Sequence, residues 1–262
     1  MLRVVRSELV RLARPRLLAG WFGLMALFAV MVNFIMFSVA TGSSSAPTGP
    51  GVGFPSAAEL AGPTGVVAGL SAAASMFGVV TLAFWAIAAG TDFQSGLIRL
   101  LASTERKRWK LVIGKVLALS LMTAAATTVA LLVTTVVAPI AAQAAGVSTD
   151  MWGSDPTVML SAWANSFAAM IVWGSIGLTL AIVFRSSAVA ISIGVGYVLV
   201  VESVVSLALD NSSWLLGSTM QALAAGGNSV STYGAAFALG VVYVTVALVC
   251  SVVTMQRRDI TD

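Results

Sequence analysis

Histidine is absent from this chain, and cysteine occurs once, as Cys250. Without histidine, the sequence lacks the commonest metal ligand and general base of proteins. One cysteine cannot form an intrachain disulfide, so cysteine usage does not constrain the redox compartment. Charged residues are also scarce: they make up 9% of the 262 residues, against about 25% in a soluble domain. These deficits argue against a soluble enzyme that uses histidine or metal chemistry.

A nucleotide-binding motif is missing as well. The Gly114-Lys115 pair does not complete a phosphate-binding loop, because Trp109 stands where the motif needs glycine and Val116 where it needs Ser or Thr. Serine is abundant, but no histidine is present to activate it as a nucleophile. We therefore expect no enzymatic activity, no catalytic or metal-binding residues and no cofactor in this chain.

Hydrophobic residues, in contrast, make up 58% of the chain and gather in long runs. About 20 apolar residues span the hydrocarbon layer as a helix, whereas barrel strands would alternate over about ten residues. The sequence thus predicts an all-α integral membrane protein with a single transmembrane domain over residues 1–262. Its six spans are expected at residues 17–40, 66–90, 111–138, 158–184, 188–209 and 235–253.

All 14 Lys and Arg residues fall on one side of the membrane when these six spans are threaded. The connections on the other side carry acids and no base: Glu59, Asp150, Asp155 and Asp210. Because bases beside helix ends are retained in the cytoplasm, we expect both termini to be cytoplasmic in a bacterial cell membrane. The net charge of +4 then reports orientation rather than nucleic-acid binding.

Two shorter segments have distinct patterns. Residues 1–14 alternate as an amphipathic helix at the inner surface, ended by Pro15; the alternative is an ordinary basic flank of the first span. Residues 210–233 are too short for a full span and too apolar for a free loop, so a re-entrant extracellular hairpin is expected before the last span.

Tryptophan and glycine positions predict further features. Tryptophans near the predicted membrane faces are expected in interfacial belts: Trp21, Trp85, Trp109, Trp152 and Trp214. Trp173 falls mid-span, where packing is the favoured role. Small residues allow helices to approach closely, and the pairs Gly174/Gly177 and Gly194/Gly196 are expected at such contacts.

The long basic loop between the second and third spans, residues 91–115, is the most informative segment. As a helix, it would present an apolar stripe of Phe93, Leu97, Leu100 and Leu101. Such a helix could dock in a partner's groove. It could equally lie flat on lipid, held by Arg106, Lys107 and Arg108. The periodicity leaves these two alternatives open.

The order of residues in this loop resembles the junction of the second and third spans in type-two ABC transporter permeases. That family has an acid, a Gly-Thr pair, a Leu-rich stretch, Ser-Pro and Arg, then Gly-Lys opening the next span. Here Asp92 stands for the usual Glu, Gly96-Leu97 for Gly-Thr, and Ser103-Thr104 for Ser-Pro. The resemblance covers the whole chain in layout and about 25 residues in sequence.

The resemblance implies the membrane subunit of an ATP-driven exporter for an amphipathic or hydrophobic substrate. A second permease subunit, identical or related, would complete the membrane part. Separate ATP-binding subunits, which carry ATP and Mg, would grip residues 91–108 as a coupling helix. The implied partner-binding residues are Asp92, Phe93, Gln94, Gly96, Leu97, Arg99, Leu100, Leu101 and Arg106.

Glu202 is the ionisable residue expected deepest in a span, about 10 Å below the outer boundary. Acids at such depth mark function by default, so Glu202 is a candidate for the substrate path or for proton coupling. The alternative is a near-interface carboxyl bonded to Ser203, Ser206 or water. Two other functions stay open: an ion-coupled secondary transporter that uses Glu202, and a non-transporting membrane assembly subunit. Membrane lipid is an expected partner in every case; nucleic acid is not.

Overall fold

The computed structural model describes residues 2–42, 55–98, 100, 108–153, 155–208, 213–228 and 231–257. Within these ranges all regular secondary structure is helical, and no strand occurs. Six helical segments are long and apolar enough to cross a membrane: α2 (Pro15–Thr41), α5 (Ala74–Gln94), α7 (Trp109–Ala145), α8 (Pro156–Phe184), the continuous segment Ser187–Val205, and α12 (Tyr233–Arg257). The chain is therefore an all-α, multi-pass membrane protein, as its sequence predicts.

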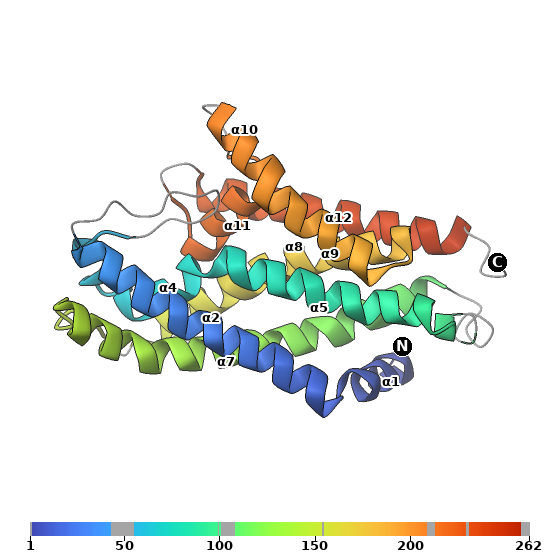
Figure 1. Ribbon diagram of the computed structural model, residues 1–262, viewed down its shortest axis with the longest axis horizontal. Helices are drawn as coiled ribbons and strands as arrows, with labels where there is room; N and C mark the ends of the chain where they lie inside the picture. The colour runs from blue at the N-terminus through green and yellow to red at the C-terminus, as the bar shows by residue number, and fades with distance from the viewer. Residues whose placement is uncertain are drawn as a thin grey trace.

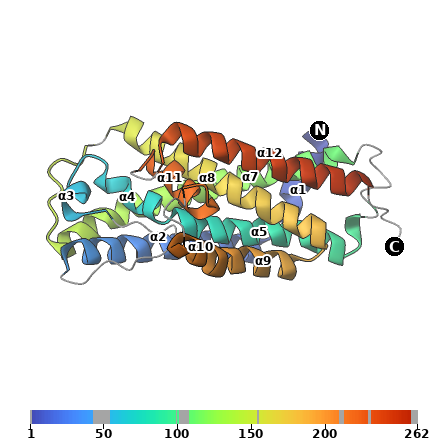
Figure 2. The ribbon, with the colours of Figure 1, turned by 90° about the horizontal axis from the view of Figure 1, so that it is seen from above.

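The remaining helices are short and lie at or between the spans. The segment Ser187–Val205 comprises α9 (Ser187–Gly196), a π-helical turn η1 (Tyr197–Glu202) and the start of α10 (Ser203–Ala208). The others are α1 (Leu2–Leu12), α3 (Ala57–Leu60), α4 (Gly65–Ala72) and α11 (Leu216–Ala225). The long helices run side by side, with α1 at the same end of the bundle as the C-terminal end of α12 (Figures 1 and 2). We call this the α1 end, and the opposite one the far end.

Three spans differ from the predicted helices by more than a few residues at their ends or by an internal irregularity. The second span, expected at 66–90, is broken at Ala73 into α4 and α5, and α5 continues to Gln94. The third, expected at 111–138, is the 37-residue α7, which contains Pro139. At 1.5 Å per residue α7 is about 55 Å long, so it extends well beyond a hydrocarbon layer of about 30 Å. The fifth, expected at 188–209, contains the π-helical turn.

Local capping explains where α8 begins. Asp155 Oδ1 accepts hydrogen bonds from the backbone N–H and the hydroxyl of Thr157, both 2.8 Å long. These bonds favour the carboxylate and lower the pKa of Asp155. Pro156 then occupies the first helical position, where its missing N–H has no intrahelical partner to lose.

Glycines allow α5 and α8 to pack closely against each other. The ring of Trp173 on α8 covers Gly78 on α5, and the ring of Trp85 on α5 covers Gly174 on α8, so that a Cβ on either glycine would meet the indole within 2.5 Å. The predicted close contacts at Gly174, Gly177 and Gly194 are confirmed. Gly196 was predicted with them, but a Cβ there meets nothing within 4 Å.

We expect Gly177→Ala to destabilise the protein by about 1–2 kcal/mol, because the added Cβ would lie 2.3 Å from the backbone carbonyl oxygen of Leu82 and the helices must separate. Gly196→Ala is the matched control: it also places alanine in a membrane-spanning helix, here the fifth span, but in open space, so stability should stay the same or rise slightly. Thermal unfolding in detergent compares the two. Equal midpoints for both variants would contradict the close contact.

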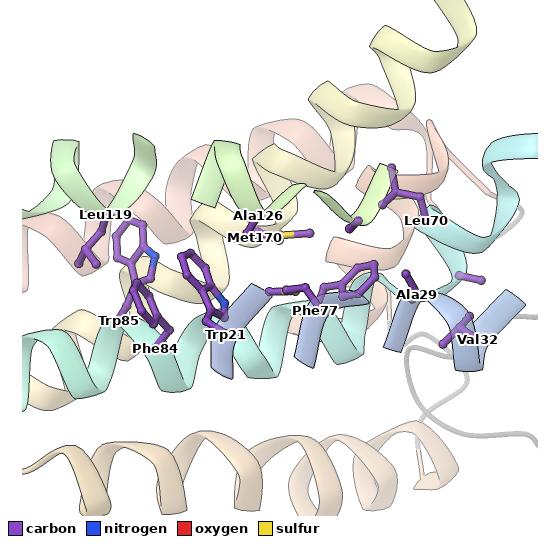
Figure 3. Close-up of a cluster of buried hydrophobic side chains, with 14 of the residues drawn as sticks. Trp21, Ala29, Val32, Leu70, Phe77, Phe84, Trp85, Leu119, Ala126 and Met170 are labelled. Atoms are coloured by element: carbon purple, nitrogen blue, oxygen red, sulfur yellow. The ribbon is translucent and has the colours of Figure 1, made fainter. Parts of the chain in front are cut away.

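Trp21 and Trp85 are part of the cluster of buried hydrophobic side chains (Figure 3). Trp21 of α2 stacks on Phe84 of α5 with ring centroids 3.7 Å apart, and the Trp85 indole N–H donates to Thr123 Oγ1 at 3.0 Å. The prediction that Trp21 and Trp85 sit in an interfacial belt is therefore wrong, since both are buried. Sequence position alone could not separate a core tryptophan from an interfacial one. Trp173 is buried, as its packing role predicts.

The fifth span packs against the bundle at its N-terminal end and diverges from it toward its C-terminal end. Its first part, α9, packs against α5 and α8, whereas α10 diverges from the other helices (Figure 1). The side chains around η1 consequently expose large apolar groups: Leu199, Val200 and Val204. In a membrane this face is available to lipid or to another subunit.

Candidate functional site

A glycine turn sets the direction of the chain after α5. The Ser95 N–H donates to the Thr91 carbonyl at 2.9 Å and the Gly96 N–H to the Phe93 carbonyl at 3.2 Å. Gly96 has φ +70°, a left-handed conformation that favours glycine at a helix C-terminus. Leu97, Ile98 and Leu100 are again helical, so Gly96 re-aims the chain at the α1 end into a second helical segment.

This segment buries a residue that the predicted stripe omitted. Ile98 is buried in the core cluster, Phe93 and Leu97 are half-buried, and Leu100 is 63% exposed. Gln94 is exposed just before the turn. The structure therefore anchors the segment through Ile98 and presents Leu100 outward. Three predicted contact residues lie outside the described residues: Arg99, Leu101 and Arg106.

Asp92 lies inside the protein, not at its surface. Its carboxylate pairs with the guanidinium of Arg11 and lies 2.6 Å from Lys115 Nζ in an ion pair. Glu8 completes the cluster: its Oε1 accepts from Arg11 at 2.7 Å and its Oε2 from Lys115 Nζ at 2.8 Å. Asp92 and Glu8 are each 3% exposed. We call these four residues the charge cluster.

The charge cluster joins three helices with balanced charge. Glu8 and Arg11 belong to α1, Asp92 to α5 and Lys115 to α7, so two acids face two bases. Lys115 Nζ also donates to the Ala88 carbonyl at 3.2 Å. Buried charges are costly unless each is paired and hydrogen-bonded. All four charges here are paired and each makes at least one hydrogen bond, while Asp92 Oδ2 meets Lys115 Nζ as an ion pair only. The charge cluster holds α1 against the bundle at the point where α5 ends.

The coupling-segment candidate and the last span meet the same cluster. A small cavity of about 20 Å³ is lined by Glu8, Asp92 and Lys115, together with Ile98 and, from α12, Met255. Arg108, just before α7, donates to the Met255 carbonyl at 3.3 Å. Ile98, in the segment that starts at Gly96, thus lines one cavity together with residues of α1, α5, α7 and α12.

Sequence reasoning missed the role of Glu8 and Lys115. Glu8 is the one acid among the bases of residues 1–16, and Lys115 lies two turns inside α7. An ionisable residue within a span calls for a partner, and that signal was available for Lys115. The pairing across α1, α5 and α7 was not, because it joins positions 107 residues apart.

Glu202 lies at a second junction, between η1 and α11. Its carboxylate is fully buried, and Oε1 accepts a hydrogen bond from the Ser218 backbone N–H at 3.0 Å. Gly217 packs so closely that a Cβ there would lie 2.5 Å from Oε1 and 2.6 Å from Oε2. Among the described residues, Oε2 has no hydrogen-bond partner. Glu202 therefore caps the N-terminus of α11 from a neighbouring span, a partner that the sequence did not suggest.

Two tyrosines support the same junction. The Tyr197 hydroxyl accepts from the Leu216 N–H at 3.3 Å, and the Tyr243 hydroxyl of α12 donates to the Trp214 carbonyl. α11 itself packs on α8 and α12, and its buried face includes Met220 and Leu223. The predicted apolar stretch 210–233 thus contains a buried helix held by Glu202 and Tyr197. Its re-entrant path stays a prediction.

The described residues offer no metal site, since no group of three His, Cys, Asp or Glu side chains is placed to hold an ion. The two clusters of polar side chains instead link helices, so that a movement of one helix would displace its neighbours. One cluster joins α1, α5 and α7, and the other joins the fifth span, α11 and α12. Both lie among apolar side chains, where unpaired polar groups are most costly.

One protein family has a profile that matches residues 26–261. The matched region includes Asp92, Lys115 and Glu202, but not α1. The description of that family states no activity, and no curated protein matches the chain. Because the match covers most of the sequence, the chain belongs to the family described as "Protein of unknown function (DUF2705)".

Proposed function

We propose that this chain is the membrane-spanning permease subunit of an ATP-driven ABC exporter. Two such subunits, identical or related, would move an amphipathic or hydrophobic substrate outward through a bacterial cell membrane. ATP hydrolysis would take place in separate subunits bound at the α1 end, which would be cytoplasmic. The charge distribution supports this orientation, since bases near helix ends favour the cytoplasmic side.

The observation that carries the proposal is the segment after Gly96. It leaves α5 at a left-handed glycine, buries Ile98 and exposes Leu100. A short helix that is firmly anchored yet presents an apolar side chain is suited to a partner's groove. A helix lying on lipid would not need the Ile98 anchor.

The charge cluster supplies a route for movement. Force applied to the segment reaches α5 directly through the Gly96 turn, and Asp92 connects that turn to Arg11 and Lys115. Arg108 links the start of α7 to the end of α12 at Met255. A partner that moves the segment would therefore move several helices together, as rigid-body alternating access requires.

An apolar groove supports the expected kind of substrate. It measures about 300 Å³ and is lined by Phe167 and Val172 of α8, Leu223 of α11, and Phe237 and Val241 of α12. That volume lies at the lower end of the range for small-molecule sites, which are mostly apolar. The exposed apolar face around η1 offers a surface for the second permease subunit.

The test is purification of the full chain from its native membranes in mild detergent. We expect an ATP-binding protein in stoichiometric amount, and we expect Leu100→Asp to release it, because a charge would enter the partner's apolar groove. Leu97→Asp should act in the same way, but Leu100 is the cleaner position because it is exposed.

Met151→Asp is the matched control, since Met151 is 64% exposed but lies between α7 and α8 at the far end. It should retain the partner. Failure to recover any ATP-binding protein, or equal loss with Met151→Asp, would count against the exporter.

A second candidate function is an ion-coupled secondary transporter. The buried Glu202 Oε2, which has no hydrogen-bond partner among the described residues, is the observation that favours it. In that case transport would follow an ion gradient without an ATP-binding partner, and Glu202→Gln would abolish it.

A further inference from the structure

The elbow between α1 and α2 carries arginines that the charge cluster does not use. Arg6, Arg14 and Arg16 are exposed, and in the part of the chain that the structure describes no acid forms an ion pair with any of them. Glu8, the acid of α1, is already shared by Arg11 and Lys115. Positive charge is therefore concentrated and uncompensated where the chain enters the first span.

The position of this elbow is fixed by protein contacts. α1 buries Glu8 and Leu12 against the bundle, and Gly114 of α7 admits Val4 so closely that a Cβ there would lie 2.5 Å from Val4 Cγ1. Arg14 is extended, and Pro15 then opens α2. The guanidinium groups of Arg14 and Arg16 thus extend from a rigid corner, beside a surface cleft formed by Arg14–Leu17.

Below Arg16, α2 has a shallow exposed face. Gly20, Gly23 and Leu27 follow Arg16 at helical spacings of four, three and four residues, so the four share one side of the helix. All four are exposed, and a Cβ on either glycine would meet nothing within 4 Å. This side of α2 therefore carries positive charge at Arg16 and, next to it, an apolar surface where the backbone of Gly20 and Gly23 is exposed. We call that apolar surface the glycine face.

We propose that the α1–α2 elbow binds an anionic phospholipid of the membrane leaflet at the α1 end. Arg14 and Arg16 bind the headgroup phosphate, and one acyl chain lies along Gly20 and Gly23 to reach Leu27. Charge complementarity selects the lipid, because exposed arginines at this depth attract anionic headgroups. This binding site is independent of whether the chain is an exporter.

The test uses the full chain in detergent with dioleoylphosphatidylglycerol as the probe and dioleoylphosphatidylcholine for comparison. Native mass spectrometry counts the lipids retained. We expect the double variant Arg14→Gln/Arg16→Gln to lower phosphatidylglycerol affinity roughly 30-fold and to leave phosphatidylcholine unchanged. The double variant Arg185→Gln/Arg257→Gln is the matched control, since it removes two exposed arginines that follow or end α8 and α12 at the same end of the bundle, and it should retain the lipid.

A second variant tests binding of the acyl chain separately from charge. Gly20→Leu/Gly23→Leu keeps both arginines but covers the glycine face, and the described neighbours leave room for the new side chains. It should reduce phosphatidylglycerol retention several-fold. Equal lipid retention by wild type and Arg14→Gln/Arg16→Gln would overturn the proposal. So would loss of a co-purifying protein from that variant with lipid unchanged, because the elbow would then be a protein-binding surface.

Discussion

Asp92→Ala is expected to destabilise the protein by about 3–5 kcal/mol, because it leaves two buried bases with one acid, Glu8, and so an uncompensated positive charge in the interior. Arg11 and Lys115 would both lose an ion pair, and Lys115 is only 8% exposed. α1 would lose its link to the end of α5. Unfolding of the purified chain in increasing denaturing detergent measures the loss.

The double variant Asp92→Ala/Lys115→Met isolates the cause. It removes one positive charge together with the carboxylate and leaves the balanced Glu8–Arg11 pair in place, so it should be more stable than Asp92→Ala alone. Asp150→Ala is the control, since Asp150 is exposed and its side chain accepts one hydrogen bond among the described residues, from Ser148. If Asp92→Ala were as stable as Asp150→Ala, the cluster would not hold α1 in place.

Glu202→Ala is expected to cost about 2–3 kcal/mol. The carboxylate accepts from the Ser218 N–H at the start of α11, and hydrogen bonds to charged groups contribute about 1.5–3 kcal/mol. Without it, the Ser218 N–H would lose its side-chain acceptor in apolar surroundings. Hydrogen exchange of the α11 amides should rise together with the fall in stability.

Two comparisons sharpen this expectation. Glu202→Gln keeps an acceptor oxygen but loses the charge, so its cost should be smaller than that of alanine. Glu59→Ala removes another glutamate that caps a helix, through a 2.7 Å bond from the Ser56 N–H, but at an exposed site; its cost should stay below about 1 kcal/mol. A Glu202→Ala variant no less stable than Glu59→Ala would show that α11 does not depend on the buried carboxylate.

Asp92 in the charge cluster and Glu202 beside α11 both have structural contacts that differ from the roles predicted for them. Asp92 was expected to contact a partner, but its carboxylate faces Arg11 and Lys115, so its contribution to coupling would be to hold the segment's root. Leu100 is the side chain of that segment presented outward. Glu202 was expected on a substrate path, and the structure places it against α11. Any substrate contact by Glu202 would require α11 to move first.

The errors in the sequence predictions have a common source. Trp21 and Trp85 were placed by their distance from a span end, yet each turns into the core. Gly194 and Gly196 have the same local signal, but a close neighbour, Leu82, lies only against Gly194. In each case the residue type suits the predicted location, but its actual surroundings depend on how a neighbouring helix packs.

The sequence by itself determined the class of the protein, the number of spans and their common charge asymmetry. Those properties follow from how single segments partition between water and hydrocarbon, which depends on local composition alone. Only the tertiary structure decided that Glu8, Arg11, Asp92 and Lys115 share one buried cluster, and that Glu202 caps α11. A charge can stay in an apolar interior only beside its counterpart, and which counterpart it meets is set by the packing of helices distant in sequence.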